Sequence, residues 1–270
     1  LGSADARRFQ SARSLTRQEV PMASLSNKNI VVIGGSRGVG QATVRALLAE
    51  GARVLAVARG TQDLARLADE LPAVTTLALD AADENAPARV FAALAPDVLV
   101  VAGGAKRTGA PLHELAWKDF SAVWDTDVKA SFLFCKAALR QPLPPGTTVI
   151  LVSSGAGLGG SPISGGYAGA KRMQMFMANY AQKESDRLKL GLRFLALVPQ
   201  TPMPDTDGGK AAVAAYAKYL GIAPEEFVAR LGTPQTAQDV ARAIVAFASH
   251  PDARSGNVFI VSAKGIEAAP

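Results

Sequence analysis

Short apolar runs alternate along the chain with longer amphipathic segments from residue 29 onward. The short runs are nearly continuous in Val, Ile, Leu and Ala. This pattern is typical of strands in a parallel sheet whose two faces are both covered by helices. It predicts strands at Asn29–Gly34, Arg53–Ala58, Val74–Asp80, Val98–Ala102, Thr147–Ser153, Arg193–Val198 and Asn257–Val261.

The longer segments between these runs carry apolar residues at helical spacing. Alternation of strands and helices implies right-handed crossovers and a doubly wound sheet with helices on both faces. We therefore expect an α/β fold of the Rossmann type in a single domain that covers residues 25–270. The predicted helices are Val39–Glu50, Gln62–Leu71, Glu84–Leu94, Trp117–Leu139, Ser164–Lys189 and Ala237–Ser249.

Residues 199–232 interrupt this alternation, first with several Pro and Gly residues and then with helical patterns at Lys210–Tyr219 and Pro224–Leu231. The insertion is longer than a connector needs, and it begins where a strand ends. Because ligands of open α/β sheets bind beyond the carboxyl ends of strands, residues 200–232 are interpreted as a substrate lid. A hairpin that contacts another subunit is the alternative. The apolar lid residues, which suggest a moderately apolar substrate, are Met203, Tyr216, Tyr219, Leu220 and Phe227.

Composition and charge exclude several classes of protein. The chain is 49% hydrophobic and 19% charged, which is ordinary for a packed domain. No apolar run approaches the ~18 residues that span a bilayer, so a membrane partner is not expected. The net charge of +6 is spread without clusters of Lys and Arg among aromatics, so nucleic acid is not expected either. The one cysteine, Cys135, cannot form an internal disulfide, which fits a reducing, cytoplasmic location.

Residues 1–24 are rich in Arg, Ser and Ala and supply +2 of the net charge, from four Arg against Asp5 and Glu19. They faintly resemble an organelle transit peptide. We favour a disordered leader, translated from upstream or added during cloning. The segment is therefore left out of the predicted fold.

A glycine-rich turn follows the first predicted strand and begins the first helix. Gly34, Gly38 and Gly40 stand where a pyrophosphate must approach backbone N–H groups at the positive end of a helix dipole. Side chains at these positions would obstruct that approach or forbid the turn. Three glycines alone are a weak signal, but between a strand and a helix they predict a dinucleotide site.

The end of the second strand bears on the choice of cofactor. Proteins that bind NAD place Asp or Glu there for the ribose hydroxyls, whereas this chain has Val57-Ala58-Arg59. Arg37 and Arg59 can instead hold a 2′-phosphate, because a guanidinium matches phosphate geometry. This favours NADP(H); two solvated arginines are the alternative.

Candidate catalytic residues lie in the second half of the chain. Tyr167 and Lys171 are four residues apart, which places them on one face of a helix, and Ser154 ends the preceding strand. Hydride transfer to a carbonyl leaves an alkoxide that needs a proton. A phenol exchanges protons poorly at neutral pH unless a neighbouring ammonium stabilises its phenolate, which Lys171 can do. Ser154 can hold the carbonyl oxygen. A Tyr-x-x-x-Lys pair alone is common by chance; the upstream Ser and the glycine turn favour catalysis.

With these motifs the chain resembles the short-chain dehydrogenase/reductase family, classical type, from about Leu25 to Gly265. The resemblance implies a sheet of seven parallel strands, NADP(H) or NAD(H), and a homotetramer or homodimer. It also implies contact of Asp80 with adenine, of Lys171 with the nicotinamide ribose, and of the backbone at Val198, Pro199 and Thr201 with nicotinamide. The residues that match the family's glycine motif are Gly34, Gly35, Ser36, Arg37, Gly38, Val39 and Gly40.

Three positions depart from the family pattern. Val101-Ala102-Gly103-Gly104 replaces Asn-Asn-Ala-Gly beside the adenine ribose, and Pro199-Gln200 replaces Pro-Gly. Asp127 stands where the family has an Asn that supports a water relay to the Lys. If the relay uses the main-chain carbonyl, Asp127 still serves. Its carboxylate would partly cancel the charge of Lys171, so we expect activity displaced toward alkaline pH and an Asp127→Asn variant at least as active.

These observations predict a carbonyl reductase or alcohol dehydrogenase that acts on a small carbonyl or alcohol compound. Tyr167 would be its general acid and base. The alternative is a sensor or scaffold protein that binds NADP(H) with little or no turnover, which Asp127 and Gln200 favour. No metal site is predicted, because His113 and His250 are isolated from other ligands.

Overall fold

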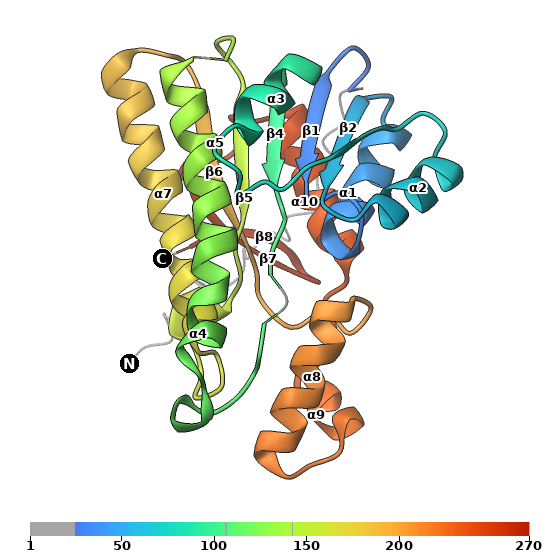
Figure 1. Cartoon of the computed structure of the whole chain (residues 1–270), viewed down its shortest axis with the longest axis vertical. Helices are drawn as coiled ribbons and strands as arrows, with labels where there is room; N and C mark the ends of the chain where they lie inside the picture. The colour runs from blue at the N-terminus through green and yellow to red at the C-terminus, as the bar shows by residue number, and fades with distance from the viewer. Residues whose placement is uncertain (1–24, 106, 142, 270) are drawn as a thin grey trace, which may run out of the picture.

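The fold is described from a computed structural model, which places residues 25–105, 107–141 and 143–269. The prediction of a leader at residues 1–24 lies outside the described residues. Over the described part, one sheet stands between two layers of helices, with a smaller helical unit at one end (Figure 1). This is the Rossmann-like α/β architecture that the apolar pattern predicts.

The sheet has the strand order β3-β2-β1-β4-β5-β6-β7-β8. Neighbouring strands from β3 to β7 pair in parallel, and the chain reverses its direction of winding between β1 and β4. Such a reversal opens a crevice at the carboxyl ends of the strands. The strands are β1 (Asn29–Ile33), β2 (Arg53–Ala58), β3 (Thr75–Ala78), β4 (Val98–Val101), β5 (Thr148–Val152), β6 (Arg193–Pro199), β7 (Val258–Ser262) and β8 (Gly265–Ala268).

The eighth strand corrects the prediction of seven parallel strands. β8 follows a tight turn after β7 and pairs with it in antiparallel fashion, as an edge strand. Of its four residues only Ile266 is partly buried, so β8 has no apolar run to mark it in the sequence. The seven predicted strands are all present and parallel, and the hairpin with β8 extends that sheet.

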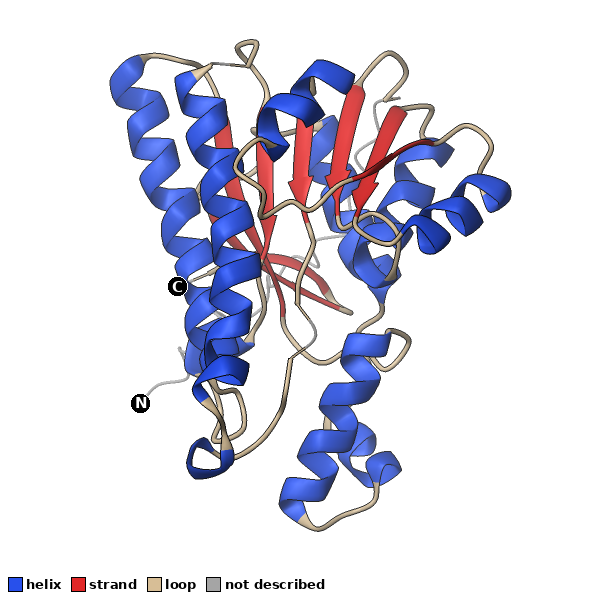
Figure 2. Cartoon of the chain, in the orientation of Figure 1, coloured by secondary structure: helices blue, strands red, loops and turns tan. Residues whose placement is uncertain are grey.

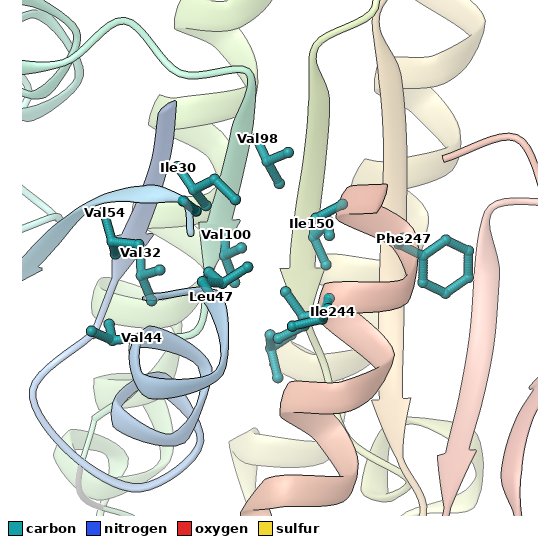
Figure 3. Close-up of a cluster of buried hydrophobic side chains, with 14 of the residues drawn as sticks. Ile30, Val32, Val44, Leu47, Val54, Val98, Val100, Ile150, Ile244 and Phe247 are labelled. Atoms are coloured by element: carbon teal, nitrogen blue, oxygen red, sulfur yellow. The ribbon is translucent and has the colours of Figure 1, made fainter. Parts of the chain in front are cut away.

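Alternation along each strand sends side chains to two separate cores. In β1, Ile30 and Val32 join a core on one face, while Val31 and Ile33 join the core on the other. Successive side chains of a strand point to opposite faces, and both faces are buried here. The strands are therefore continuous apolar runs in the sequence. Figure 3 shows the first core, where Leu47 lies among the strand side chains.

Helices α1, α2 and α10 cover the first face, and α3, α5 and α7 cover the second (Figure 2). Apart from the start of α5, their ends agree with the predicted ends to within about three residues, and α10 agrees at both ends. A capping box between Thr236 and Asp239 fixes the start of α10. The bounds are α1 (Gly38–Ala49), α2 (Thr61–Glu70), α3 (Ala86–Ala93), α5 (Lys129–Arg140), α7 (Gly166–Leu188) and α10 (Ala237–Ser249).

The predicted single helix Trp117–Leu139 is wrong in one respect. It consists of α4 (Trp117–Val123), a π-helical segment η2 (Trp124–Val128) and α5. Thr126 Oγ1 donates a hydrogen bond to the Ala122 carbonyl, and Ser131 Oγ donates one to the Asp127 carbonyl. Side chains that bond to the backbone in this way compete with regular helix and accompany the local break. The break turns Asp127 toward the interior, where it is 2% exposed.

Residues 200–232 form the smaller unit, with α8 (Asp207–Leu220) and α9 (Pro224–Arg230). These helices project beyond the carboxyl ends of the strands (Figure 1). Tyr216 and Phe227 stack on each other at 5.1 Å between ring centroids, in a small core of their own. Phe227 is therefore buried inside the unit, and Tyr219 and Leu220 are exposed. Of the apolar residues predicted to favour an apolar substrate, Phe227 is thus occupied by packing within the unit.

Cys135 lies in the core beneath α3, α5 and α7. Burial raises the pKa of its thiol to about 12. Such a thiol is a small core residue and not a nucleophile, as the sequence context suggests. No helix in the described ranges has both the length and the apolar character to cross a membrane.

The first turn of α7 packs directly on α4, and this contact supplies a test of the fold. A Cβ atom at Gly166 would lie 2.0 Å from the Phe120 carbonyl oxygen, whereas one at Gly208 in α8 meets nothing within 4 Å. We expect Gly166→Ala to lower the free energy of unfolding by about 1–3 kcal/mol through overpacking. Gly208→Ala should leave it unchanged or raise it by up to about 1 kcal/mol. Urea unfolding of both variants measures this, and equal midpoints would contradict it.

Candidate active site

Tyr167 and Lys171 lie together at the start of α7, near the carboxyl end of β5. The Lys171 Nζ atom is 5.6 Å from the centroid of the Tyr167 ring, so the two side chains share one face of the helix. Tyr167 is half-buried and Lys171 is 5% exposed. The arrangement sets a phenol that solvent and substrate can reach beside an ammonium that they scarcely reach.

Two oxygen atoms hold the Lys171 ammonium in place. Its Nζ donates to the Val152 carbonyl at the end of β5, at 3.2 Å. It also forms an ion pair with Asp127 Oδ2 at 3.1 Å. Ser153 adds a link through the backbone, since its Oγ donates to the Lys171 carbonyl at 2.6 Å. These bonds fix the first turns of α7 against β5 and η2.

The carboxylate of Asp127 is itself held on both oxygen atoms. Its Oδ1 accepts hydrogen bonds from the Ala105 N–H at 2.8 Å and from Thr126 Oγ1 at 3.0 Å. A Cβ atom at Gly104 would lie 3.0 Å from Oδ2, so the small residue there leaves room for the carboxylate. The main-chain carbonyl of Asp127, the other candidate for a water relay, accepts the Ser131 hydroxyl. Asp127 thus joins the loop after β4 to α7.

The electrostatics of Lys171 follow from this pair. Burial alone would lower the pKa of the ammonium, because the charged form loses its hydration. The charge of Asp127, with smaller contributions from Tyr167 and from the Asp127 hydrogen bond, outweighs burial and raises the pKa above its ordinary value. Arg107 acts in the opposite direction. Lys171 is therefore a cation throughout the neutral and moderately alkaline range.

Ser154 follows directly after β5 and Ser153, on the same edge of the sheet. It is half-buried, and its Oγ accepts a weak hydrogen bond from the Ala156 N–H at 3.3 Å. Because Ser154 Oγ is the acceptor in this bond, its hydroxyl can still donate a proton to another group. The structure thus places Ser154 two residues after Val152, the strand end that Lys171 contacts.

Arg107, which no pattern in the sequence singled out, reaches Tyr167 from another element. Its guanidinium lies 4.2 Å from the centroid of the Tyr167 ring. Arg107 belongs to the loop after β4, and it lines a small cavity together with Ile163 and α8 residues that include Ala212 and Tyr216. The sequence offered one signal for this residue: it is basic and stands three positions after Gly104, in the loop that follows β4.

The glycine turn between β1 and α1 is built by close backbone contacts. Gly34 has φ of +80°, and a Cβ atom there would lie 2.4 Å from the Gly103 Cα atom. A Cβ atom at Gly40 would lie 2.0 Å from the Gly34 carbonyl oxygen. Gly38 has φ of +52°, a backbone angle that residues other than glycine rarely adopt. The backbone of Ala102 and Gly103 after β4 therefore packs directly against Gly34 in the turn.

The start of α1 fits the phosphates of a dinucleotide. Arg37 occupies the N-cap position without a side-chain cap, and the first turn has no acidic residue. The first N–H groups of a helix lack partners within it, and they carry the positive end of its dipole. The nearest atoms to a Cβ at Gly38 belong to Thr206, at 3.7 Å, so the smaller unit of residues 200–232 meets this end. Ser36 is buried in the turn, and Val39 packs against the first core.

Two arginines mark the end of the crevice where adenosine is expected. Arg59, directly after Ala58 at the end of β2, lies 4.0 Å from Asp80 Oδ2. Arg37 lies 3.4 Å from Asp63 Oδ2, and Arg66 of α2 shares that carboxylate. Both Arg37 and Arg59 are well exposed, and their weak contacts leave both side chains free to turn toward an anion. Asp80 is exposed beside Arg59, where the adenine contact was predicted.

The opposite end of the crevice lies after β6. Thr201 Oγ1 is buried and has no hydrogen-bond partner among the described residues. The Thr201 N–H donates to Gln235 Oε1 at 3.3 Å, and Gln235 in turn donates to the Val261 carbonyl. An unpartnered buried hydroxyl is costly, and it fits a polar group such as a carboxamide. Pro199 is buried, and Gln200, which replaces a glycine of the family pattern, is exposed.

Several residues of the site had no sequence signal of their own. Ser153, Thr206 and Gln235 are polar residues of ordinary type, and their contacts join segments far apart in the chain. In the ranges that the structure describes, no group of three or more His, Cys, Asp or Glu side chains is placed to hold a metal ion.

Comparison with known proteins agrees with this geometry. A sequence profile described as short chain dehydrogenase matches residues 28–202. A 2,5-dichloro-2,5-cyclohexadiene-1,4-diol dehydrogenase of Sphingobium indicum is 33% identical over 208 residues, covering 70% of this chain and 80% of that protein. A cyclic-di-GMP-binding biofilm dispersal mediator protein of Escherichia coli is 32% identical over 195 residues, covering 70% of this chain and 78% of that protein.

A solved structure described as a short chain dehydrogenase/reductase family protein shares the fold. It superposes with a TM-score of 0.68 at 21% identity, over 88% of this chain and 97% of its own. The sequence match covers the glycine turn, β1 to β6 and the whole of α7. The chain therefore belongs to the short chain dehydrogenase family, whose members are oxidoreductases that use a nicotinamide cofactor.

Proposed function

We propose that this protein transfers a hydride between NADP(H) and a carbonyl or alcohol compound, with Tyr167 as the general acid and base. The observation that carries the proposal is the half-buried phenol of Tyr167 beside the buried ammonium of Lys171, 5.6 Å from its ring. Ketone reduction and oxidation of a secondary alcohol are the two directions of this one reaction. The substrate is a small molecule held under the lid.

Bound nicotinamide supplies or accepts the hydride. The chain's own groups manage the proton. In reduction, the Tyr167 hydroxyl donates its proton to the developing alkoxide, and the ammonium of Lys171 stabilises the phenolate that remains. Ser154 donates a hydrogen bond to the same substrate oxygen and orients it. In oxidation the phenolate takes the proton back from the alcohol.

Asp127 positions Lys171 and also weakens its effect. Its carboxylate lies 3.1 Å from the ammonium and raises the pKa of Lys171, so the cation persists to high pH. The negative charge also cancels part of the positive field at the Tyr167 oxygen. The phenolate is then less stabilised than beside an unpaired ammonium, and activity is displaced toward alkaline pH.

The choice of NADP(H) is supported by Arg37 and Arg59. They come from the glycine turn and from the end of β2, the two elements that border the adenosine ribose in this fold. Neither is buried, and a phosphate dianion is a stronger partner than a carboxylate at 3.4 or 4.0 Å. The end of β2 carries no acidic residue to hold ribose hydroxyls.

A homodimer or homotetramer is proposed on the basis of an apolar face on α5 and α7. Phe132 is 50% exposed and Tyr180 is 54% exposed, and Phe176 stacks on Tyr180. Exposed aromatics on two adjacent helices are typical of surfaces that pair with another copy. Sedimentation equilibrium measures the assembly, and a monomer at micromolar concentration contradicts the proposed dimer or tetramer.

A cytoplasmic location is proposed as well, since Cys135 is a core thiol.

The alternative is a protein that binds its cofactor or another nucleotide with little turnover. It is favoured by one relative, the Escherichia coli protein, whose name describes cyclic-di-GMP binding. Asp127 and Gln200, which depart from the family pattern, favour it also. The intact set of Ser154, Tyr167 and Lys171 argues for turnover, because a site without turnover need not retain all three.

Removal of the Tyr167 hydroxyl separates these two functions. We expect Tyr167→Phe to lower kcat for NADPH-dependent ketone reduction by about 1000-fold, since general acid catalysis is lost. Tyr180→Phe removes a hydroxyl from an exposed position on the same helix and should retain full activity. Nicotinamide absorbance, followed with a panel of ketones and alcohols, is the measurement. Cofactor binding without turnover in the wild type would support the alternative.

The charge of Asp127 determines a second prediction. In Asp127→Asn the ammonium of Lys171 loses its carboxylate partner, so its full charge acts on Tyr167. We expect the pH at half-maximal kcat for alcohol oxidation to fall by about one unit, with activity at neutral pH equal or higher. Profiles measured between pH 6 and pH 10 test this. A loss of activity at every pH would show that the carboxylate itself is required.

The two arginines determine a third prediction. We expect Arg37→Ala and Arg59→Ala each to raise the KM for NADPH by about tenfold or more, because each removes charge-assisted hydrogen bonds to the 2′-phosphate. The KM for NADH should change less than about twofold. Arg66→Ala is the matched control, since Arg66 shares the Asp63 carboxylate but lies on the exposed side of α2. Equal kcat/KM for NADH and NADPH in the wild type would refute the assignment.

A further inference from the structure

Arg107 is a cation beside the Tyr167 ring that neither the fold nor the family pattern explains. Arg107 is half-buried, and its guanidinium lies 4.2 Å from the centroid of the Tyr167 ring. It comes from the loop after β4, whereas Lys171 comes from α7 itself. Two cations therefore approach one phenol from different elements.

The two cations differ in how their charges are balanced. Lys171 pairs with Asp127 at 3.1 Å. For Arg107, no carboxylate lies within 4.0 Å among residues 25–105, 107–141 and 143–269. A half-buried guanidinium without a counterion carries a desolvation cost that an anionic ligand removes. Of the two cations beside Tyr167, Arg107 is therefore the one without a carboxylate partner in the described part of the chain.

The loop that carries Arg107 is packed against the lid. A Cβ atom at Gly109 would lie 2.9 Å from the Ala215 Cβ atom of α8, so loop and lid are in direct contact. Between them lies a small cavity lined by Arg107 and Tyr216 and otherwise by apolar or small residues, which are Gly109, Ile163, Ala211, Ala212 and Ala215. Arg107 thus extends from this cavity to the Tyr167 ring.

The other polar group of the cavity already has a partner. The Tyr216 hydroxyl lies 2.7 Å from Ser161 Oγ, which in turn lies 2.9 Å from Ser164 Oγ. These hydrogen bonds tie the lid helix to the segment before α7. In the described lining Arg107 is therefore the group left to select a charged ligand, beside small apolar walls.

We propose that Arg107 binds a carboxylate of the substrate, so that the compound reduced or oxidised at Tyr167 is a small oxo acid or hydroxy acid. This rests on the proposed function and adds the class of its substrate. A guanidinium presents two parallel N–H donors that match a carboxylate. One guanidinium balances one negative charge, and the described lining offers no second cation for a phosphate dianion. The small apolar walls suit a short carbon chain.

Two probes of nearly equal shape test this inference: 3-oxobutanoate, which is an anion, and 3-oxobutanamide, which is neutral. We expect the wild type with NADPH to reduce the acid with a kcat/KM at least tenfold above that for the amide. Arg107→Gln should lower kcat/KM for the acid by about 100-fold, mainly through KM, and change it less than about threefold for the amide. Arg107→Lys should recover part of the loss.

Lys210→Gln is the matched control. It removes a positive charge from the lid helix at a solvent-exposed position, and it should leave both probes unaffected. An equal loss for acid and amide in Arg107→Gln would overturn the inference, because the residue would then act on Tyr167. A pH profile for the amide that is unchanged in Arg107→Gln supports the substrate role. Stronger competition by inorganic phosphate than by acetate would overturn the carboxylate assignment.

A binding measurement separates failure of this inference from failure of the proposed function. Saturation-transfer NMR with the protein and NADP⁺ reports whether each probe binds, with or without turnover. Binding of 3-oxobutanoate that is lost in Arg107→Gln supports the inference even if NADPH is not consumed, in which case the proposed reaction fails alone. Equal binding of acid and amide to the wild type overturns the inference and leaves the proposed reaction intact.

Discussion

The site depends on one buried ion pair, between Lys171 and Asp127. Their side chains are 7% and 1% exposed, so both charges have lost their hydration, and each is acceptable only because the other is present. The pair joins η2 to α7, and hydrogen bonds to Ala105 and Val152 extend it to the loop after β4 and to β5. The position of the Tyr167 phenol follows from these four attachments, since Tyr167 lies one helical turn before Lys171.

Most of the fold was predictable because burial on two faces leaves a strong pattern. The seven parallel strands and α10 show this, since apolar runs and the capping box at Thr236 are local signals. β8 left no such signal, because it is a short edge strand with one partly buried side chain. The break at η2 was hidden as well. Its apolar spacing continues through Trp124–Val128, and the break involves hydrogen bonds of Thr126 and Ser131 to the backbone.

Part of the site was predictable for the same reason. A spacing of four residues puts Tyr167 and Lys171 on one helix face, and a Gly-rich turn between strand and helix indicates phosphate binding. The contact between Asp127 and Lys171 joins elements 44 positions apart, and only the family resemblance suggested it. Arg107 had no such guide, because its place over Tyr167 depends on the path of a loop. Phe227 was misjudged, since it packs against Tyr216 in the small core of residues 200–232.

The distribution of charge along the crevice connects these features. The Asp127 carboxylate offsets part of the Lys171 charge, so the field of Lys171 at Tyr167 is moderate. Arg107 has no carboxylate partner among the described residues, and Arg37 and Arg59 meet carboxylates only at 3.4 and 4.0 Å. Arg37 is the N-cap residue of α1, and the first turn of that helix has no acidic residue. Arg107 is then the cation beside Tyr167 that has no carboxylate partner among the described residues, whereas the charges of Lys171 and Asp127 offset each other. The ion pair therefore has an electrostatic role beyond stability: it keeps Lys171 from adding a second uncompensated charge next to the Tyr167 phenol.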